Sequence, residues 1–340
     1  MAVSMHDVAR HAGVSQRTVS NVVNGYAHVA PATRARVQAS IEALHYRPNP
    51  IARRLRRGRT STVTLALPSL HERYFADLAA AVVAEARLRE LKVLVETTEG
   101  DREVELRILR GGDLLTDGVI MSAVALTAED EKIRHPDYPL VLVGDRQLRS
   151  QIDHVGADNR RAAREAVLHL LDTGRRRIAL LGVGHGPTRT FNLRRRGYTD
   201  ALTRYKLPVD ERLLIDSTWT RAGGEAAIAR HLASDSPPFD AVFAMNDSAA
   251  FGAMRAVLRS GLKVPADVAI VGFDNIDEAH SSVPSLTSVG PAYADIARAA
   301  LDLLQVQADS QGERQPEQRR VPFELHVRES STPPSRKSRA

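Results

Sequence analysis

Along residues 1–46, hydrophobic positions recur every three or four residues in short runs, which is the spacing of amphipathic helices. Ser4 with Asp7 forms a capping-box pattern, Gly13 suits the end of a first helix, and Ser15 suits the start of a second. A third run begins at Pro31. The apolar residues of the three runs are Val8, Ala9, Ala12, Val19, Val22, Val23, Val37, Ile41 and Leu44. The pattern predicts a small all-α unit of three helices around a core of valines.

From residue 61 to residue 329, short β-rich runs alternate with helical stretches such as "FADLAAAVVAEARLRE" and "RAAREAVLHLLDTG". This alternation is typical of βα units, which form parallel sheets with helices on both faces. The candidate strands are "TVTLALP", "KVLVETT", "GVIMS", "LVLVGD", "RIALLG", "AVFAMND", "VAIVGFD" and "LTSVG". Because a single sheet of so many strands would be very wide, we expect an α/β core of two doubly wound parallel-sheet subdomains.

Residues 47–60 connect these two parts and contain both helix-start and helix-stop residues. Asn49 is a good N-cap, Pro50 suits the first helical position, and Gly58 suits a helix end. Such a helix has about two turns and is too short to be stable alone in water. Its apolar face consists of Ile51, Ala52 and Leu55, and arginines occupy the rest. We therefore expect a hinge helix that forms only when anionic groups neutralise the arginines and a partner covers the apolar face.

The net charge is concentrated at the N-terminal end. Residues 1–60 hold ten arginines and no lysine against Asp7 and Glu42, a net charge of +8, whereas the whole chain carries +6 and the remaining residues therefore −2. This distribution suggests a small domain that binds a polyanion, attached to a nearly neutral body. Charge alone fits a solvated basic surface equally well.

The composition narrows the class of protein further. The chain has no cysteine, so disulfides and thiolate metal sites are excluded. The N-terminus lacks a signal-peptide pattern, and no run of about 18 apolar residues is present, so we expect a cytoplasmic protein without a membrane partner. Residues 330–340, "SSTPPSRKSRA", are Ser/Pro-rich and basic and are expected to form a disordered tail.

The face of the second helix that points away from the valine core carries long or amide side chains. Arginine can donate two hydrogen bonds to guanine in the major groove, and asparagine or glutamine can pair with adenine. A merely solvated face would not require these side chains, although helix-turn-helix patterns also occur by chance. The residues on this face are Gln16, Arg17, Ser20, Asn21 and Asn24.

Ligands of open α/β sheets bind beyond the carboxyl ends of the strands. The residues at these ends are Pro68, Ser69, Ser122, Asp145, Gly182, Asn246, Asp247 and Asp274, and Tyr74, Phe75 and Trp219 lie near them. Short polar groups with an aromatic wall suit a sugar or a small heterocycle. Each residue also has a plainer interpretation: Asp145, Asn246 and Asp274 as helix caps, Tyr74 and Phe75 as core, and Arg194 as a solvated charge.

The segment "HDVARHAGVSQRTVSNVVNG…VAPATRARVQASIEALHYRPNPIARRL" resembles the DNA-binding headpiece of the LacI/GalR family of bacterial transcriptional regulators. The resemblance implies base contacts by Gln16 and Arg17 and base or phosphate contacts by Ser20 and Asn21. Together with Asn24 on the same face, and with Ser4 and Arg53, these are the expected DNA-binding residues. Leu55 matches the leucine that family members insert between central base pairs of the minor groove, where two hinge helices pair.

Later segments, among them "VFAMNDSAAFGAMRAVLRSGLKVPADVAIVGFDNID" and "LHVRES", are similar to the family's effector-binding core, whose fold is of periplasmic-binding-protein type. The resemblance implies effector contacts by Asp145, Arg194, Trp219, Asn246 and Asp274, with Tyr74 and Phe75 closing the pocket. "ERYF" at 72–75 is closer to purine-binding than to sugar-binding members, so the expected effector is a sugar or a purine or nucleoside-like molecule. No heptad pattern follows Arg328, so the expected assembly is a homodimer.

Catalytic patterns are missing from the sequence. "GVGHG" at 182–186 lacks the full dinucleotide-binding spacing, and neither H-E-x-x-H nor G-x-S-x-G is present, so we expect no catalytic residues, no metal and no cofactor. The prediction is a repressor that binds a pseudo-palindromic double-stranded operator through residues 1–46 and a small effector through residues 61–329. The alternatives are a small-molecule-binding protein with a vestigial headpiece, an activator, and a regulator without an effector.

Overall fold

The computed structural model describes residues 3–26, 28–46, 60–110, 116–127, 129–130, 138–144, 152–184, 189–310 and 314–332. The chain forms two compact units: Met1–Ser61, which contains the headpiece, and Thr62–Ala340, which contains the core. Arg53, Leu55 and Asp145 lie outside the described residues, as do residues 47–59 of the predicted hinge and the tail from residue 333.

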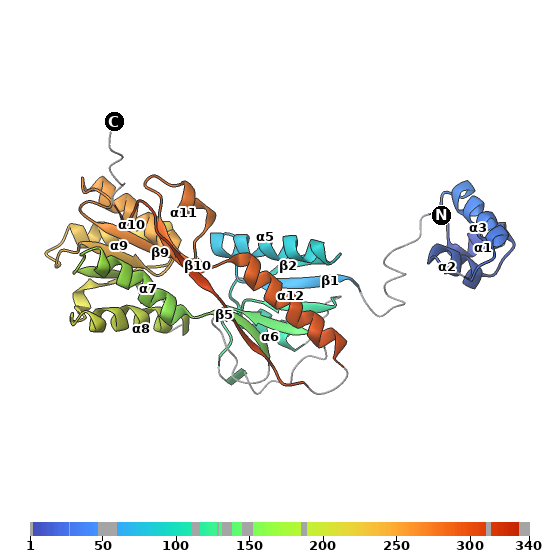
Figure 1. Cartoon of the computed structure of the whole chain (residues 1–340), viewed down its shortest axis with the longest axis horizontal. Helices are drawn as coiled ribbons and strands as arrows, with labels where there is room; N and C mark the ends of the chain where they lie inside the picture. The colour runs from blue at the N-terminus through green and yellow to red at the C-terminus, as the bar shows by residue number, and fades with distance from the viewer. Residues whose placement is uncertain are drawn as a thin grey trace. The chain divides into compact units, whose positions relative to one another are not determined.

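Three helices build the headpiece: α1 (Met5–Ala12), α2 (Gln16–Val23) and α3 (Pro31–Ala43) (Figure 1). α1 starts with the predicted capping box between Ser4 and Asp7 and ends at Gly13, whose φ of 61° lies in the left-handed region. The buried side chains at its centre are Val8, Ala9, Ala12, Val19, Val22 and Val37. The predicted three-helix unit with its valine core is confirmed.

The first subdomain of the core is a parallel sheet in the order β11-β5-β4-β3-β1-β2. Its strands are β1 (Thr62–Leu67), β2 (Lys92–Thr97), β3 (Gly118–Met121), β4 (Leu140–Val143), β5 (Asp153–Ala157) and β11 (Gln318–Val321), and its helices are α5 (Arg73–Leu88), α6 (Arg102–Leu109) and α12 (Tyr293–Asp309). Alternate strand residues point to opposite faces: Leu65 packs with α5 and α12, and Ala66 packs with α6. Helices therefore cover both faces, as predicted.

The second subdomain is a sheet in the order β12-β10-β9-β8-β6-β7. Its elements are β6 (Ile178–Val183), β7 (Leu214–Asp216), β8 (Ala241–Ala244), β9 (Ala269–Phe273), β10 (Thr287–Pro291), β12 (Phe323–His326), α7 (Asn159–Asp172), α8 (Arg189–Arg204), the 3-10 helix η2 (Glu211–Leu213), α9 (Arg221–Leu232), α10 (Asp247–Arg259) and α11 (Asp277–Ser281). α7 and α8 cover one face, and α9, α10 and α11 cover the other.

One strand pair departs from the predicted all-parallel sheets, because β12 runs antiparallel to β10. The reason is the path of the chain. β10 leaves the second sheet at Pro291, and β12 enters it beside the same end, where Phe323 pairs with Pro291. A strand that enters where its neighbour leaves must run in the opposite direction.

The described chain passes between the subdomains at three places: after Ala157, after Pro291 and after Val321. β5 belongs to the first sheet, whereas α7, which follows it, packs on the second. β10 and α12 make the reverse passage, and β11 and β12 lie one residue apart in different sheets (Figure 1). Because β5 and β10 both reach a passage at their carboxyl ends, the carboxyl ends of the two parallel sheets face each other.

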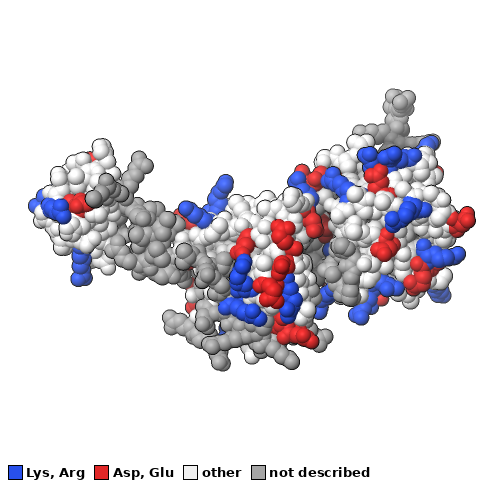
Figure 2. All heavy atoms as spheres, turned by 180° about the vertical axis from the view of Figure 1, so that it is seen from behind, with Lys and Arg blue, Asp and Glu red and all other residues white. Residues whose placement is uncertain are grey.

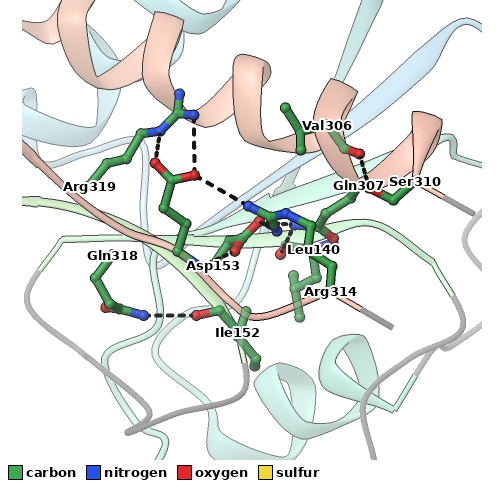
Figure 3. A network of polar contacts seen from close by, with 10 residues as sticks. Leu140, Ile152, Asp153, Val306, Gln307, Ser310, Arg314, Gln318 and Arg319 are labelled. Atoms are coloured by element: carbon green, nitrogen blue, oxygen red, sulfur yellow. Dashed lines mark hydrogen bonds and ion pairs between the residues drawn. The ribbon is translucent and has the colours of Figure 1, made fainter. Parts of the chain in front are cut away.

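A buried carboxylate anchors the segment that leads into β11 (Figure 3). Asp153 of β5 accepts hydrogen bonds from Gln307 Nε2 (2.8 Å), Arg314 Nη1 (2.5 Å) and the Glu317 backbone nitrogen (2.6 Å). These contacts join β5, the end of α12 and the segment that leads into β11. The position of β11 beside β5 thus depends on contacts between residues far apart in the sequence.

The second subdomain includes the first residues of the segment that was predicted to be disordered. Ser330 and Ser331 are buried, and the Thr287 backbone nitrogen donates to Ser330 Oγ at 2.8 Å. Ser330 Oγ in turn donates to the Ile270 carbonyl at 2.6 Å. Both serines therefore belong to the second subdomain, because their hydroxyls bond to its strands.

Candidate DNA-binding face and effector cleft

The start of α2 exposes the side chains that were predicted to read bases. Ser15 caps the helix by accepting from the Thr18 backbone nitrogen at 3.1 Å. Val19 and Val22 are buried against α1 and α3, and this orientation leaves Gln16 and Arg17 exposed. Ser20 and Asn21 are half-buried on the adjoining surface.

Two other predicted DNA-binding residues are engaged at helix ends. Ser4 Oγ donates to Asp7 Oδ2 at 2.6 Å as part of the capping box of α1. Asn24 follows α2, and its side-chain nitrogen donates to the Ser20 carbonyl at 2.7 Å. Both side chains have a structural role in the headpiece.

A cavity of about 420 Å³ lies between the subdomains, at the carboxyl ends of their strands. This volume falls within the range of about 300–1,000 Å³ that is usual for small-molecule sites. Six of the seven predicted effector residues line it: Tyr74, Phe75, Arg194, Trp219, Asn246 and Asp274. The seventh, Asp145, lies outside the described residues. We call this cavity the effector cleft.

Arg194 of α8 is buried in the wall of the effector cleft, with 6% of its surface exposed. Its Nε donates to Asn159 Oδ1 at 2.7 Å, its Nη1 donates to the Met245 carbonyl, and its Nη2 donates to Asp274 Oδ1 at 3.2 Å. The guanidinium also lies over the Phe273 ring, 3.5 Å from the centroid. Arg194 is therefore a buried, paired cation, and the interpretation as a solvated charge is wrong.

Asn246 serves both as a helix cap and as a residue of the cleft wall. It caps α10 by accepting from the Ala249 backbone nitrogen at 2.9 Å, and its Nδ2 donates to the Trp219 carbonyl at 2.9 Å. Trp219 Nε1 donates to the Gly182 carbonyl at 2.9 Å, which fixes the indole. The capping interpretation thus holds for Asn246. It fails for Asp274, because α11 starts after Ile276 and has no side-chain cap.

Aromatic side chains form the opposite wall. Tyr74 packs edge-on against Phe75, with ring centroids 5.1 Å apart, and at a tilt against Tyr293, with centroids 5.6 Å apart. The Tyr293 hydroxyl donates to the Asp274 carbonyl at 2.9 Å, and burial raises the pKa of this phenol above its ordinary value. Phe75 is buried in the first subdomain, so it is core as well as wall.

Comparison with known proteins places the chain in a family. Residues 4–49 match "Bacterial regulatory proteins, lacI family", and residues 167–331 match "Periplasmic binding protein-like domain". Catabolite control protein A of Priestia megaterium is 34% identical over 308 residues, covering 89% of this chain and 92% of that protein. This chain belongs to the lacI family. It is a DNA-binding transcriptional regulator with an effector-binding core.

Further transcriptional regulators are similar to this chain in sequence or in structure. The HTH-type transcriptional regulator AscG of Escherichia coli (strain K12) is 34% identical over 294 residues, covering 84% of this chain and 86% of that protein. The solved structure of the Lac repressor dimer bound to operator and the anti-inducer ONPF matches with a TM-score of 0.83 at 27% identity, covering 97% and 99% of the two chains. The transcriptional regulator CelR–cellobiose complex matches with a TM-score of 0.69 at 31% identity, covering 96% and 99%.

Sequence reasoning missed several residues that line the effector cleft of this lacI-family member. They are Glu72, Ala123, Val124, Gly144, Arg189, Thr190 and Thr220. Arg189 and Thr190 begin α8, and Thr220 caps α9, so both groups follow the carboxyl end of a strand. That position is a signal that could have identified them, because helix starts at these ends surround the cleft.

The surface charges of the core differ from those of the headpiece. On the face drawn in Figure 2, acidic and basic side chains are interspersed over the core, as its overall charge of −2 would suggest. In the ranges that the structure describes, no helix is long and apolar enough to cross a membrane. Within the same ranges, no group of three or more histidine, aspartate or glutamate side chains is arranged to hold a metal ion.

Proposed function

We propose that this lacI-family regulator is a repressor whose affinity for a pseudo-palindromic operator changes when a small molecule binds in the effector cleft. The observation that carries the proposal is the presence, in one chain, of a helix start with exposed Gln16 and Arg17 and of a cleft that Asp274 lines. The proposed division is a headpiece at 1–46, a hinge at 47–60 and a core from residue 61. The protein would act in the cytoplasm.

On the DNA side, Gln16 and Arg17 would contact base edges in the major groove. Ser20, Asn21, Asn24 and Ser4 would supply further base or phosphate contacts around them. Arg53 and Leu55 would lie in the minor groove, where the leucine would open a base step and bend the duplex. These assignments rest on the family resemblance and, for α2, on the exposure of its first turn.

For the effector we propose a neutral sugar, with room for a disaccharide. Asp274, Asn246 and Arg194 offer acceptors and donors for hydroxyl groups around one side of a cavity of about 420 Å³, and Trp219 offers an apolar wall. The relative CelR was solved with cellobiose. A purine or nucleoside is the competing class of effector, and binding measurements with glucose, cellobiose and adenosine separate the two classes.

Coupling between effector and operator requires that the subdomains have two arrangements. A candidate contact that would differ between them lies at the start of α5. Arg73 pairs with Asp77 of its own subdomain at 2.7 Å and with Glu278 of the other at 3.5 Å, and Arg221 also pairs with Glu278, at 3.2 Å. Since Arg73 precedes Tyr74 and Phe75 directly, a ligand that moves this wall would also change these ion pairs.

A homodimer is proposed through the exposed apolar surface formed by α5 and β2. Leu88 is 80% exposed and Leu94 57% exposed, and Val83 and Val95 add to the same two elements. β2 is an edge strand of its sheet, so its free edge is also available for contact. The Lac repressor relative was solved as a dimer on its operator.

We propose no catalytic activity, because the matched relatives are regulators.

The decisive experiment is selection of duplexes bound from a random pool by the full chain, with and without glucose, cellobiose and adenosine. We expect an inverted repeat, enriched less strongly in the presence of the ligand. The selected duplex is then titrated at increasing salt, and its affinity should fall by orders of magnitude between about 50 and 200 mM if several phosphates are contacted. Failure to enrich any sequence, or salt-independent binding, would sink the proposal in favour of a small-molecule-binding protein.

A further inference from the structure

The turn after β9 carries Asp274 into the effector cleft in an unusual backbone conformation. φ is 101° at Asp274 and 52° at Asn275, so two successive residues other than glycine lie in the left-handed region. Such conformations are unfavourable for residues with a Cβ atom and persist where neighbouring groups hold them. On the adjacent strand, a Cβ at Gly290 would lie only 2.8 Å from the Asp274 carbonyl carbon, so this turn is also tightly packed.

A buried carboxylate on a different element holds this turn. Asp247, the first residue of α10, has no exposed surface. Its Oδ2 accepts from the Ile276 backbone nitrogen at 2.9 Å, and its Oδ1 accepts from Ser288 Oγ at 2.6 Å. Ser288 Oγ in turn accepts from the Asn275 backbone nitrogen at 2.9 Å. Asp247 thereby holds the two residues that follow Asp274, one directly and one through Ser288.

The C-terminal segment supports the same turn from outside. Arg328 Nη2 donates to Asn275 Oδ1 and Nη1 donates to the Leu286 carbonyl, each at 2.6 Å. Burial, followed by the nearby Asp274 carboxylate, raises the pKa of Asp247, whereas the Arg328 guanidinium acts in the opposite direction. A fully buried acid is costly unless its oxygens are hydrogen-bonded, and both oxygens of Asp247 are.

Asp247 also follows Asn246 directly in the chain. Asn246 Nδ2 donates to the Trp219 carbonyl and so holds Trp219 in place. We propose that Asp247 is a positioning residue of the effector cleft: with Ser288 as a relay, it fixes the Asp274–Ile276 turn so that the Asp274 carboxylate meets the ligand. The proposal rests on the proposed function, namely that an effector binds in this cleft. Asp247 itself acts through Asp274 and does not touch the ligand.

The test uses the full chain with Asp247→Asn and, separately, Ser288→Ala. The probe is whichever of glucose, cellobiose and adenosine quenches the emission of Trp219, the single tryptophan, most strongly in the unsubstituted protein. We expect the Kd for that probe to rise at least tenfold in both variants. The asparagine side chain would place its NH2 group against either the Ile276 backbone nitrogen or the Ser288 hydroxyl, both of which are donors. Alanine at position 288 removes the hydroxyl that links Asp247 to Asn275. Hydrogen exchange should accelerate at the amides of Asn275 and Ile276. Ser285→Ala is the control, because its hydroxyl bonds to exposed Glu329 instead.

A double-mutant cycle separates positioning from general destabilisation. If Asp247 acts through Asp274, Asp247→Asn should weaken binding no further, within about threefold, once Asp274→Asn is present. Additive losses, or a Kd within threefold of the unsubstituted protein for both single variants, overturn the proposal. If the unsubstituted protein binds none of the three probes, the proposed effector classes are wrong instead. Circular dichroism establishes whether each variant is folded. If Asp247→Asn does not fold, Ser288→Ala still tests the proposal.

Discussion

Replacing Arg194 with methionine removes a buried cation whose guanidinium has three hydrogen-bond partners, on Asn159, Met245 and Asp274. Methionine fills part of the space but leaves the carboxylate of Asp274, a residue that is 7% exposed, without this charged partner. Removal of one partner of a buried ion pair costs about 3–5 kcal/mol, and charge-assisted hydrogen bonds of about 1.5–3 kcal/mol each are consistent with that value. We therefore expect Arg194→Met to lower the free energy of unfolding by about 3–5 kcal/mol.

The assay is urea unfolding followed by far-ultraviolet circular dichroism, because Trp219 lies beside Arg194 and its emission would change for local reasons. Arg195→Met is the matched control: this neighbour is 41% exposed, and its pair with Glu211 spans 3.6 Å, so we expect a change below about 1 kcal/mol. The double variant with Asp274→Asn should lose less than the sum of the two single variants. A loss below about 1 kcal/mol for Arg194→Met would refute the reasoning, because the guanidinium would then not be stabilised by its buried partners.

Four further predictions concern DNA, pH and assembly. Arg17→Ala should weaken operator binding by about 1–3 kcal/mol and relax the preference at one base pair, measured by mobility shift on single-base variants. Leu55→Ala should reduce operator bending in a circular-permutation assay and leave effector binding unchanged. Unchanged bending would contradict the proposal that Leu55 inserts between base pairs. Burial lowers the pKa of His154 to about 4, so stability should fall as pH drops from about 6.5 towards 4 while the unfolded histidine binds a proton. Urea titrations of His154→Gln should show a weaker dependence, and the remainder comes from His169 and His326, whose pKa values burial also lowers. Leu88→Asp should raise the dimer dissociation constant at least tenfold in sedimentation velocity, whereas Val327→Asp, also exposed, should not.

The features that could be predicted from the sequence depend on residues close together in the chain. The helices of the headpiece follow from valines at helical spacing and from Ser4, Gly13 and Ser15 at their ends, and all of these are found in those roles. The alternation of strands and helices likewise predicts the α/β class, and the rule of carboxyl strand ends gathers Asn246 and Asp274 around one cavity. Periodicity and capping act over a few residues, so a linear sequence carries them directly.

The features that could not be predicted depend on where distant segments meet. β5, β7, β11 and β12 were not recognised, because they are short and, in "QRRV", polar. β11 is held by Asp153 through Arg314 and Glu317, more than 150 positions away in the sequence. The antiparallel direction of β12 follows from the third passage between the subdomains, which no local pattern indicates.

The chemistry of the cleft shows the same division. From the sequence, the rule of carboxyl strand ends predicted a ligand-binding edge at Asn246 and Asp274, and the family resemblance added Arg194. Only the tertiary structure decided that Arg194 is buried and pairs with Asp274, that Asn246 caps α10 while holding Trp219, and that Asp247 lies beneath the Asp274 turn. The physical reason is that the charge state, orientation and burial of these groups are set by partners from other strands. Those partners come together only when the chain has passed between both subdomains.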